Sequence, residues 1–488
     1  MKAPTDGVCV PRAFARHTGA LIVILIAAVL PVPHDALRCA DCASRTRPPG
    51  TAQDLNLLVI TLDTTRADRI GAYRGSRAAA TPQLDRLARE GVLFEDATSP
   101  APLTLPAHCT LFSGWLPPRH GIRENVGRLD SATPTLASLL RRRGYRTGAF
   151  VAAEVLARSR GLYLGFDIYD DEFQSRNVPH APPRRGAAAV ITRAIQWITA
   201  GKSSSPFFVW IHLYDAHAPY EATAAFDRAY PGRPYEAAIA SVDAQIGRVL
   251  AFLDQTGLID RTLITVVGDH GEALGDHGEL THGLFVYQSV LRVPFIVRMP
   301  GVGLRGRRVK TAVSSVDLMP TVLELLRADL PKHVDGRSLV QTMVRSGVGG
   351  ATDIYAENLY VRRRFGWSEM RAIRSGVFKL IEKTKPELYD LEHDPGETRD
   401  LAAERPTLVA RLTRRLHAWD SRLEPAVTVG DASHTVPDLA RRQLASLGYI
   451  GATPGRVNYG RVGSDPRNHV ALFNCLATPG RAAASCAR

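Results

Sequence analysis

The feature that most constrains this chain is a short apolar run, residues 263–267, which stops at a glycine and is followed at once by an acid and a histidine. The run is rich in β-branched residues and suits a strand that is buried on both faces of a sheet. In an open α/β sheet, ligands bind beyond the carboxyl ends of the strands, which is where Asp269 and His270 fall. A carboxylate beside an imidazole is a good ligand set for zinc or a similar divalent ion. The alternative is a polar turn that binds nothing.

The loop after this strand adds weight to the metal interpretation. Asp276, His277 and His282 follow Asp269 and His270 within this one short loop. A merely solvated turn has no need for three histidines. The sequence G-D-H-G-E at residues 268–272 recurs at 275–279, but only the first copy follows a strand. Asp269 and His270 are therefore the preferred ligands.

A second acid stands at the end of a second apolar run, because residues 55–62 read as a buried strand that ends in Asp63. From there to about residue 330, strand-like runs alternate with helical segments, such as the long one at 235–254. This alternation is typical of an α/β fold with a large, mainly parallel sheet and helices on both faces.

The pattern changes after about residue 350, where short strands follow each other closely before a helix at 406–422. These segments predict a small C-terminal antiparallel sheet with one helix. Four parts are expected in all: 1–53 as a signal peptide or anchor with a flexible leader, 54–350 as the main α/β domain, 351–425 as a C-terminal α+β subdomain, and 426–488 as a C-terminal extension.

The N-terminus predicts export. Arg12 and Arg16 precede an apolar run at residues 20–32, which is the layout of a secretory signal. The run is short for a membrane-spanning helix, which needs about 20 residues. An uncleaved anchor, with membrane association through this segment, is the alternative. We therefore expect a periplasmic or secreted protein, or one held at the outer face of a membrane.

Net charge indicates the class of binding partner, and the cysteines indicate possible disulfides. The 488 residues carry a net charge of +13, with arginines in short scattered clusters that read as solvated faces and helix ends. No recognised nucleic-acid motif accompanies them, so we expect an anionic substrate and no nucleic acid. Outside the cytoplasm, Cys39 could pair with Cys42, or Cys475 with Cys486. Cys109 reads as a buried core residue.

A proline-punctuated loop places Thr104 just before an apparent helix at 108–113. The N-terminus of a helix presents free N–H groups to an anion. A hydroxyl at this place can bind a metal, lose its proton and attack an ester. The plain alternative is that the threonine caps the helix.

The chain resembles the sulfatase-type members of the alkaline phosphatase superfamily. The resemblance rests on segments in the order and rough spacing of that family: 56–68 (N-L-L-V-I-T-L-D-T-T-R-A-D), the Thr104 loop with 113–125 (S-G-W-L-P-P-R-H-G-I-R-E-N), 212–220 (H-L-Y-D-A-H-A-P-Y), 268–283 (G-D-H-G-E to T-H-G), 387–401 (E-L-Y-D-L-E-H-D-P-G-E-T-R-D-L) and 445–451 (A-S-L-G-Y-I-G). The match covers about residues 54–451.

The resemblance implies one site with named roles. It places Asp63, Thr104, Asp269 and His270 around a divalent metal, and it assigns Asn125 to a substrate oxygen. It also implies that His217 and His282 face this pocket, binding a second ion in two-metal relatives or touching the charged group of the substrate in one-metal relatives. Asp215 is a further candidate ligand. Mixed oxygen and nitrogen ligands favour zinc, with calcium, magnesium or manganese as alternatives.

His212 points along its strand, which favours a structural role. The structural interpretation is also favoured for Asp68, an acid within reach of Arg66 or Arg69. His120 and Arg123 could either line the pocket or brace the loop.

The sequence departs from true sulfatases where their signature has Cys or Ser followed by Pro and Arg. The same register here has Thr104, and His108 replaces the arginine. Oxidation of a threonine gives a ketone, so the aldehyde nucleophile of sulfatases is closed to this chain. Thr64 stands where sulfatases often have a second metal-binding Asp.

We expect a metal-dependent hydrolase of phosphate or sulfate esters that uses Thr104 directly and cleaves phosphoesters faster. The competing hypotheses are a transferase of phospho-head-groups onto an envelope glycan or lipid, and a binding protein that has kept the fold.

Overall fold

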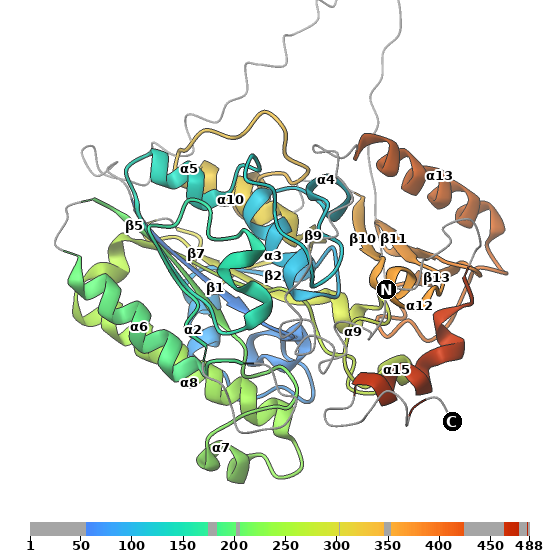
Figure 1. Cartoon of the computed structure of the whole chain (residues 1–488), viewed down its shortest axis with the longest axis horizontal. Helices are drawn as coiled ribbons and strands as arrows, with labels where there is room; N and C mark the ends of the chain where they lie inside the picture. The colour runs from blue at the N-terminus through green and yellow to red at the C-terminus, as the bar shows by residue number, and fades with distance from the viewer. Residues whose placement is uncertain are drawn as a thin grey trace, which may run out of the picture. The chain divides into compact units, whose positions relative to one another are not determined.

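The computed structural model describes residues 55–173, 183–201, 205–301, 303–345, 353–423, 463–477 and 486. The N-terminal apolar run, Cys39 and Cys42 and the segment 445–451 lie outside these described residues. Within residues 47–488, which form one compact unit, the chain builds a large sheet with helices and a smaller sheet beside it (Figure 1).

The large sheet has nine strands in the order β4-β3-β5-β1-β6-β7-β2-β8, with β9 pairing β2. Their bounds are β1 Asn56–Leu62, β2 Val92–Thr98, β3 Arg146–Phe150, β4 Ile168–Asp170, β5 Phe207–Leu213, β6 Thr262–Gly268, β7 Arg292–Arg298, β8 Arg307–Val309 and β9 Val313–Ser314. All neighbours are parallel except β7, which runs antiparallel to β6 and β2. The prediction of a mainly parallel sheet is confirmed.

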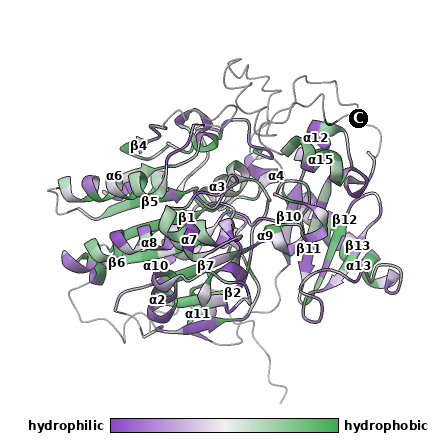
Figure 2. Ribbon diagram, turned by 90° about the horizontal axis from the view of Figure 1, so that it is seen from below, coloured by the Kyte–Doolittle hydropathy of each residue, from purple (hydrophilic) through white to green (hydrophobic). Residues whose placement is uncertain are grey.

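The central strands have the residue pattern of strands covered on both faces. Every residue of β1, β5 and β6 is buried, and Figure 2 colours these strands mostly as hydrophobic. The register pairs Leu62 of β1 with Leu213 of β5 and with Gly268 of β6. The three strands therefore end at one edge of the sheet, and the residues that follow them meet there.

Two groups of helices cover the two faces of the large sheet (Figure 1). One group consists of α2 (Pro82–Glu90), α6 (Ala187–Ala200) and α8 (Pro234–Gln255), and the other of α3 (Thr104–Ser113), α5 (Leu136–Arg142) and α10 (Leu318–Leu325). The predicted start of α3 near His108 is wrong, because the helix begins one turn earlier, at Thr104. The proline at 106 lies in the first turn, where its missing N–H costs no hydrogen bond.

The predicted C-terminal sheet and helix are both present. Its four antiparallel strands are β10 (Ile354–Asn358), β11 (Met370–Ser375), β12 (Phe378–Glu382) and β13 (Glu387–Asp390). Helix α13 (Pro406–Arg422) buries Leu412 and Leu416 in one cluster with Ile373 and Leu380 of this sheet. The backbone N–H of Glu357 donates to the carbonyl of Pro100, 2.9 Å away, and joins β10 to the loop before α3.

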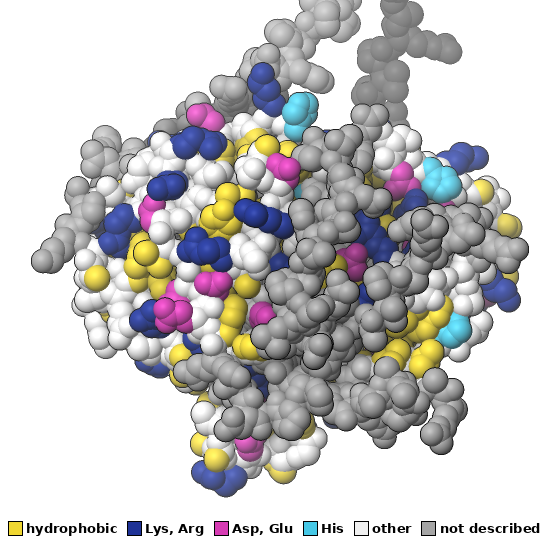
Figure 3. All heavy atoms as spheres, in the orientation of Figure 1, with side chains coloured by type: hydrophobic (Ala, Val, Ile, Leu, Met, Phe, Trp, Pro, Cys, Tyr) yellow, Lys and Arg dark blue, Asp and Glu magenta, His cyan; other side chains and the backbone are white. Residues whose placement is uncertain are grey.

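The remaining described segment, residues 463–477, contains α15 (Val470–Ala477). Cys475 is bonded to Cys486, one of the two pairings that the sequence allows. Cys109 is buried, as expected. No helix among the described residues is long and apolar enough to cross a bilayer. Lys and Arg side chains are interspersed with Asp and Glu over the face drawn in Figure 3, as expected of solvated surfaces.

Candidate active site

The acids that follow β1 and β6 come together at the edge where these strands end. Asp63, Asp269 and His270 are completely buried, and each offers a ligand atom within 4.8 Å of the others. The tight turn after β6 needs its glycine, since a Cβ at Gly271 would clash with the backbone carbonyl of Ser289. The parallel register of two strands far apart in the sequence thus builds a three-residue cluster.

In each carboxylate of this cluster, one oxygen has a polar partner within hydrogen-bond distance and the other has none. Oδ2 of Asp63 lies 3.1 Å from Nε2 of His212, and Oδ1 of Asp269 accepts from the backbone N–H groups of Thr64 and His270 at 3.1 and 2.6 Å. The other two oxygens, Oδ1 of Asp63 and Oδ2 of Asp269, are buried and have no hydrogen-bond partner.

Burial raises the pKa of Asp63 to about 7 and also raises the pKa of Asp269. Unpaired carboxylate oxygens in a buried place are costly. A divalent cation between them would satisfy both, and the adjacent imidazole would complete a mixed oxygen and nitrogen set. The residues present therefore fit a divalent metal.

Thr104 does not act as a helix cap. It is the first residue of α3, and the preceding N-cap residue, Leu103, makes no side-chain capping bond. The hydroxyl of Thr104 instead lies 3.2 Å from Nε2 of His270 and is completely buried. A hydroxyl at a helix N-terminus, beside a potential metal ligand, is placed for attack on an anion rather than for local capping.

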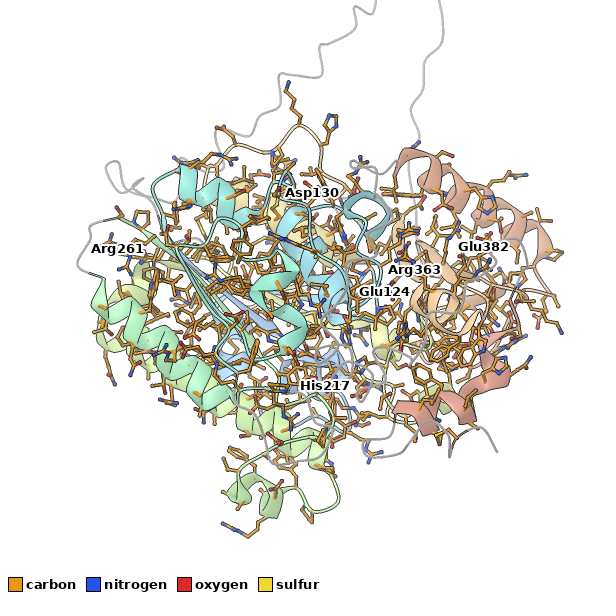
Figure 4. The ribbon with its side chains drawn as sticks, viewed as in Figure 1. Glu124, Asp130, His217, Arg261, Arg363 and Glu382 are labelled. Atoms are coloured by element: carbon orange, nitrogen blue, oxygen red, sulfur yellow. A yellow bond between two sulfur atoms is a disulfide. The ribbon has the colours of Figure 1, made fainter. Side chains whose placement is uncertain are left out.

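Asn125 lies against the same helix start. Its Oδ1 accepts from the backbone N–H of Leu105 at 2.9 Å, which fixes the side chain. Its Nδ2 is buried and has no hydrogen-bond partner. The preceding residue, Glu124, pairs with Arg363 at 3.1 Å and Figure 4 shows these two side chains next to each other. The side-chain amide of Asn125 is thus fixed through its oxygen, and its Nδ2 donor remains available.

The two pocket histidines lie next to the cluster but outside it. The ring centroids of His282 and His270 are 4.5 Å apart, and those of His217 and His282 are 5.0 Å apart. Burial lowers the pKa of His282 to about 4 and the pKa of His217 well below its usual value. Both imidazoles are therefore neutral near pH 7.

Asp215 is placed differently from the prediction. Both of its carboxylate oxygens accept from the backbone N–H of Ala187, at 3.1 and 3.0 Å, at the first residue of α6. This is the geometry of a helix cap supplied from another segment. Asp215 is therefore not among the clustered ligands that the described residues form, and this contact favours a structural role for it over metal binding.

Several side chains near the site are braces. Asp68 pairs with Arg66 at 2.9 Å, and Arg66 also reaches Asp276 at 2.7 Å. His120 lies 3.0 Å from Oγ1 of Thr110, and Nε of Arg123 is 3.2 Å from Glu357. These contacts favour the structural interpretation for Asp68, His120 and Arg123, and they pair Asp276, an acid of the second G-D-H-G-E copy, with Arg66.

Sequence reasoning gave no role to Glu272, and placed His212 only as structural. Nδ1 of His282 shares a 3.0 Å hydrogen bond with Oε1 of Glu272, which burial gives a pKa of about 8. The signal was present, since Glu272 closes the first G-D-H-G-E copy. His212 is a direct partner of Asp63, which only the pairing of β1 with β5 reveals.

His108 stands at the arginine position of the sulfatase signature. It braces the start of α3 through contacts of both ring nitrogens. Its Nδ1 lies 2.8 Å from the carbonyl oxygen of Thr104, and its Nε2 lies 3.0 Å from Oγ1 of Thr61. Burial lowers its pKa to about 3, so the ring is neutral. It therefore replaces a cation with an uncharged hydrogen-bonding group.

Comparison with known proteins finds relatives that cover most of this chain. The sulfatase family matches residues 55–328, and the C-terminal region of N-sulphoglucosamine sulphohydrolase matches residues 275–422. Arylsulfatase A of Homo sapiens is 25% identical over 467 residues, covering 79% of this chain and 90% of the relative.

Two solved structures are similar in fold. The phosphonate monoester hydrolase of Agrobacterium radiobacter aligns with a TM-score of 0.63 at 22% identity, over 76% of this chain and 96% of that one. A protein solved with D-glucosamine-2-N,6-O-disulfate aligns with a TM-score of 0.65 at 19% identity, over 77% and 100%. With a family match that spans more than half of its length, the chain belongs to the sulfatase family of ester hydrolases.

Proposed function

We propose that this protein is an exported, metal-dependent hydrolase in which Oγ1 of Thr104 attacks the phosphorus or sulfur of an anionic ester. The observation that carries the proposal is the position of this hydroxyl. It starts α3, makes no capping bond and lies 3.2 Å from His270, beside two carboxylates that each have an unpaired buried oxygen.

Asp63, Asp269 and His270 would hold the metal together with Thr104. Zinc suits this mixed set best, and calcium, magnesium or manganese are the alternatives. When bound, the ion would lower the pKa of the threonine hydroxyl and withdraw charge from the ester. His212 and the backbone N–H of Thr64 orient the two carboxylates towards it.

The other residues act on the substrate. Nδ2 of Asn125, buried without a partner, donates to an ester oxygen on which negative charge accumulates. His282 lies beside His270, His217 lies beside His282, and both would contact the charged group of the ester as neutral rings. Attack by Thr104 breaks the bond to the leaving oxygen and gives a threonine ester, which water hydrolyses to restore the hydroxyl.

The nucleophile favours phosphorus. A threonine cannot yield the aldehyde that sulfatases use, so direct attack is required. Two arginines near the pocket are already paired, Arg123 with Glu357 and Arg184 with Glu221. Because both guanidinium groups are paired, these two arginines offer little uncompensated positive charge to a dianion. We propose singly charged phosphoesters as the preferred class, meaning phosphodiesters or phosphonate monoesters, the class named for the Agrobacterium enzyme.

The test is a matched screen of aryl esters that share one leaving group. Purified protein, loaded with a single defined metal, is assayed on p-nitrophenyl phosphodiester, phenylphosphonate, phosphate monoester and sulfate. The phosphodiester or phosphonate should have the highest kcat/KM. A preference for the sulfate would overturn the substrate class, and no turnover of any ester with any metal would overturn the hydrolase assignment.

Export is proposed from Arg12, Arg16 and the apolar run at 20–32. Sequencing the N-terminus of protein recovered outside the cytoplasm tests it, and full-length protein confined to the cytoplasm would count against it.

A further inference from the structure

The segment 463–477 is anchored on the small sheet by hydrogen bonds and ion pairs. The backbone N–H of Ser368 donates to the carbonyl of Ser464 at 2.9 Å. Lys383 lies in the turn between β12 and β13, and its ammonium group is 2.7 Å from Asp465. Arg467 lies 2.6 Å from Glu387, the first residue of β13. Lys383 and Glu387 are almost completely buried, so removing one partner of these ion pairs would leave a buried charge unpaired.

The far end of this segment holds the loop that leads to His282. Oδ1 of Asn474 accepts from the backbone N–H of Leu280 at 3.0 Å, and its Nδ2 donates to the carbonyl of Gly278 at 2.8 Å. One amide side chain thus satisfies a donor and an acceptor of the loop backbone, as a neighbouring strand would. Val470 and Phe473 approach Gly278 and Gly283 from the same helix.

The loop is held on both sides of His282. Before it, Asn474 fixes residues 278–280. After it, Nδ2 of Asn358 donates to the carbonyls of Gly283 and Leu284 at 2.8 and 2.9 Å. The imidazole between these two clamps packs on His270 and bonds Glu272. The disulfide at Cys475 closes the chain directly after Asn474.

We propose that Asn474 is a positioning residue of the active site, and that residues 463–477 form a strap that sets the place of His282. The strap connects the small sheet to the backbone of residues 278–280, which leads to His282. The inference rests on the proposed function for the role of His282, but the contact between strap and loop stands without it.

The experiment compares Asn474→Ala with Asn468→Ala in the full-length protein. Asn468 lies on the same segment and is exposed, and its side chain makes no hydrogen bond to residues 278–284 in the described part of the chain, so it is the matched control. Amide hydrogen exchange is measured first, since it needs no substrate. Exchange at residues 278–284 should accelerate at least tenfold in Asn474→Ala and stay unchanged in Asn468→Ala.

Turnover is then measured on the best ester from the screen. A displaced histidine should lower kcat by about tenfold to a hundredfold with retained metal, since misplacement by about 1 Å is costly. In a His282→Ala background, Asn474→Ala should cost little more, because the two act through one group. Additive losses would overturn the positioning role even if the loop loosens.

Unchanged exchange at 278–284 would overturn the strap itself, whatever the activity. Accelerated exchange with unchanged kcat on an active enzyme would overturn its link to His282. If the wild type turns over no ester, the proposed function fails. In that case, the effect of the strap on His282 is measured from the NMR chemical shifts of the His282 ring, which should change in Asn474→Ala and stay unchanged in Asn468→Ala.

Discussion

Asp63 and Asp269 face each other from the ends of two adjacent parallel strands, and each keeps one buried carboxylate oxygen without a hydrogen-bond partner. The pairing of Leu62 with Gly268 brings them to the same level at the sheet edge. Two buried acids in such proximity repel each other when ionised, unless a cation lies between them. Their arrangement is the basis of the metal predictions that follow.

Asp269→Ala should abolish tight binding of a divalent metal, because it removes a central oxygen ligand and leaves Asp63 alone. Asp215→Ala is the matched control, since Asp215 caps α6 and should retain full metal occupancy. It should cost about 1 kcal/mol of stability, as loss of a cap does. Metal analysis after dialysis measures both. Full occupancy in Asp269→Ala would refute the site.

Thr104→Ala should lose most turnover while it keeps fold and metal, because only the attacking oxygen and a methyl group are lost. Thr104→Ser retains the hydroxyl and should keep measurable activity. The comparison of kcat for the two variants on one ester is decisive. Turnover like that of the wild type in Thr104→Ala would eliminate this residue as the nucleophile.

Asn125→Ala should lower kcat by about 10²–10³, the usual effect of removing a donor to a developing oxyanion. Metal content should not change, since Asn125 bonds the backbone of Leu105 and no clustered ligand. Steady-state kinetics with metal analysis provides the readout. A rise in KM with unchanged kcat would assign Asn125 to ground-state binding instead.

The metal-free protein should lose stability as pH rises from about 6.5 to about 8. Burial raises the pKa of Asp63 to about 7 and the pKa values of Glu272 and Glu279 to about 8. In this window the folded state binds more protons than the unfolded state, so its stability falls with increasing pH.

Buried histidines act in the opposite direction at lower pH. The pKa of His212 and of His282 is lowered to about 4, so the unfolded state binds more protons between about pH 4 and 6.5, and these groups add stability as pH rises there. Denaturant unfolding with chelator measures the sum. Added metal should flatten the decline above pH 6.5, because it favours ionised Asp63. A metal-free stability that increases from pH 6.5 to 8 would contradict this assignment.

The sequence predicted the fold and much of the site because strand ends are local signals. Asp63 and Asp269 each follow a buried apolar run, and the parallel pattern then requires that they meet. The loop pattern also placed Thr104 next to the start of a helix, although that helix begins earlier than the apolar pattern suggests. These inferences needed only residue type and position along the chain.

What the sequence could not give depends on contacts between distant segments. Asp215 follows a strand as Asp63 does, yet it turns to the N-terminus of α6, which no local pattern reveals. The bond of His282 to Glu272 and the two bonds from Asn474 to the loop likewise depend on tertiary packing. The identity of the ester depends on charge balance in the pocket, which a sequence motif leaves undetermined.

The order of strands in the large sheet also has a consequence for biosynthesis. β1 is made first, yet both of its neighbours, β5 and β6, come more than a hundred residues later, and the bond from Thr64 to Asp269 spans 205 residues. A growing chain therefore carries an unpaired, mostly apolar strand until β5 is complete at residue 213, and its second neighbour is complete only at residue 268. Such long-range closure is slow and prone to aggregation. The candidate metal site forms only in a chain that has completed this closure, so uptake of a metal there would report finished folding rather than guide it.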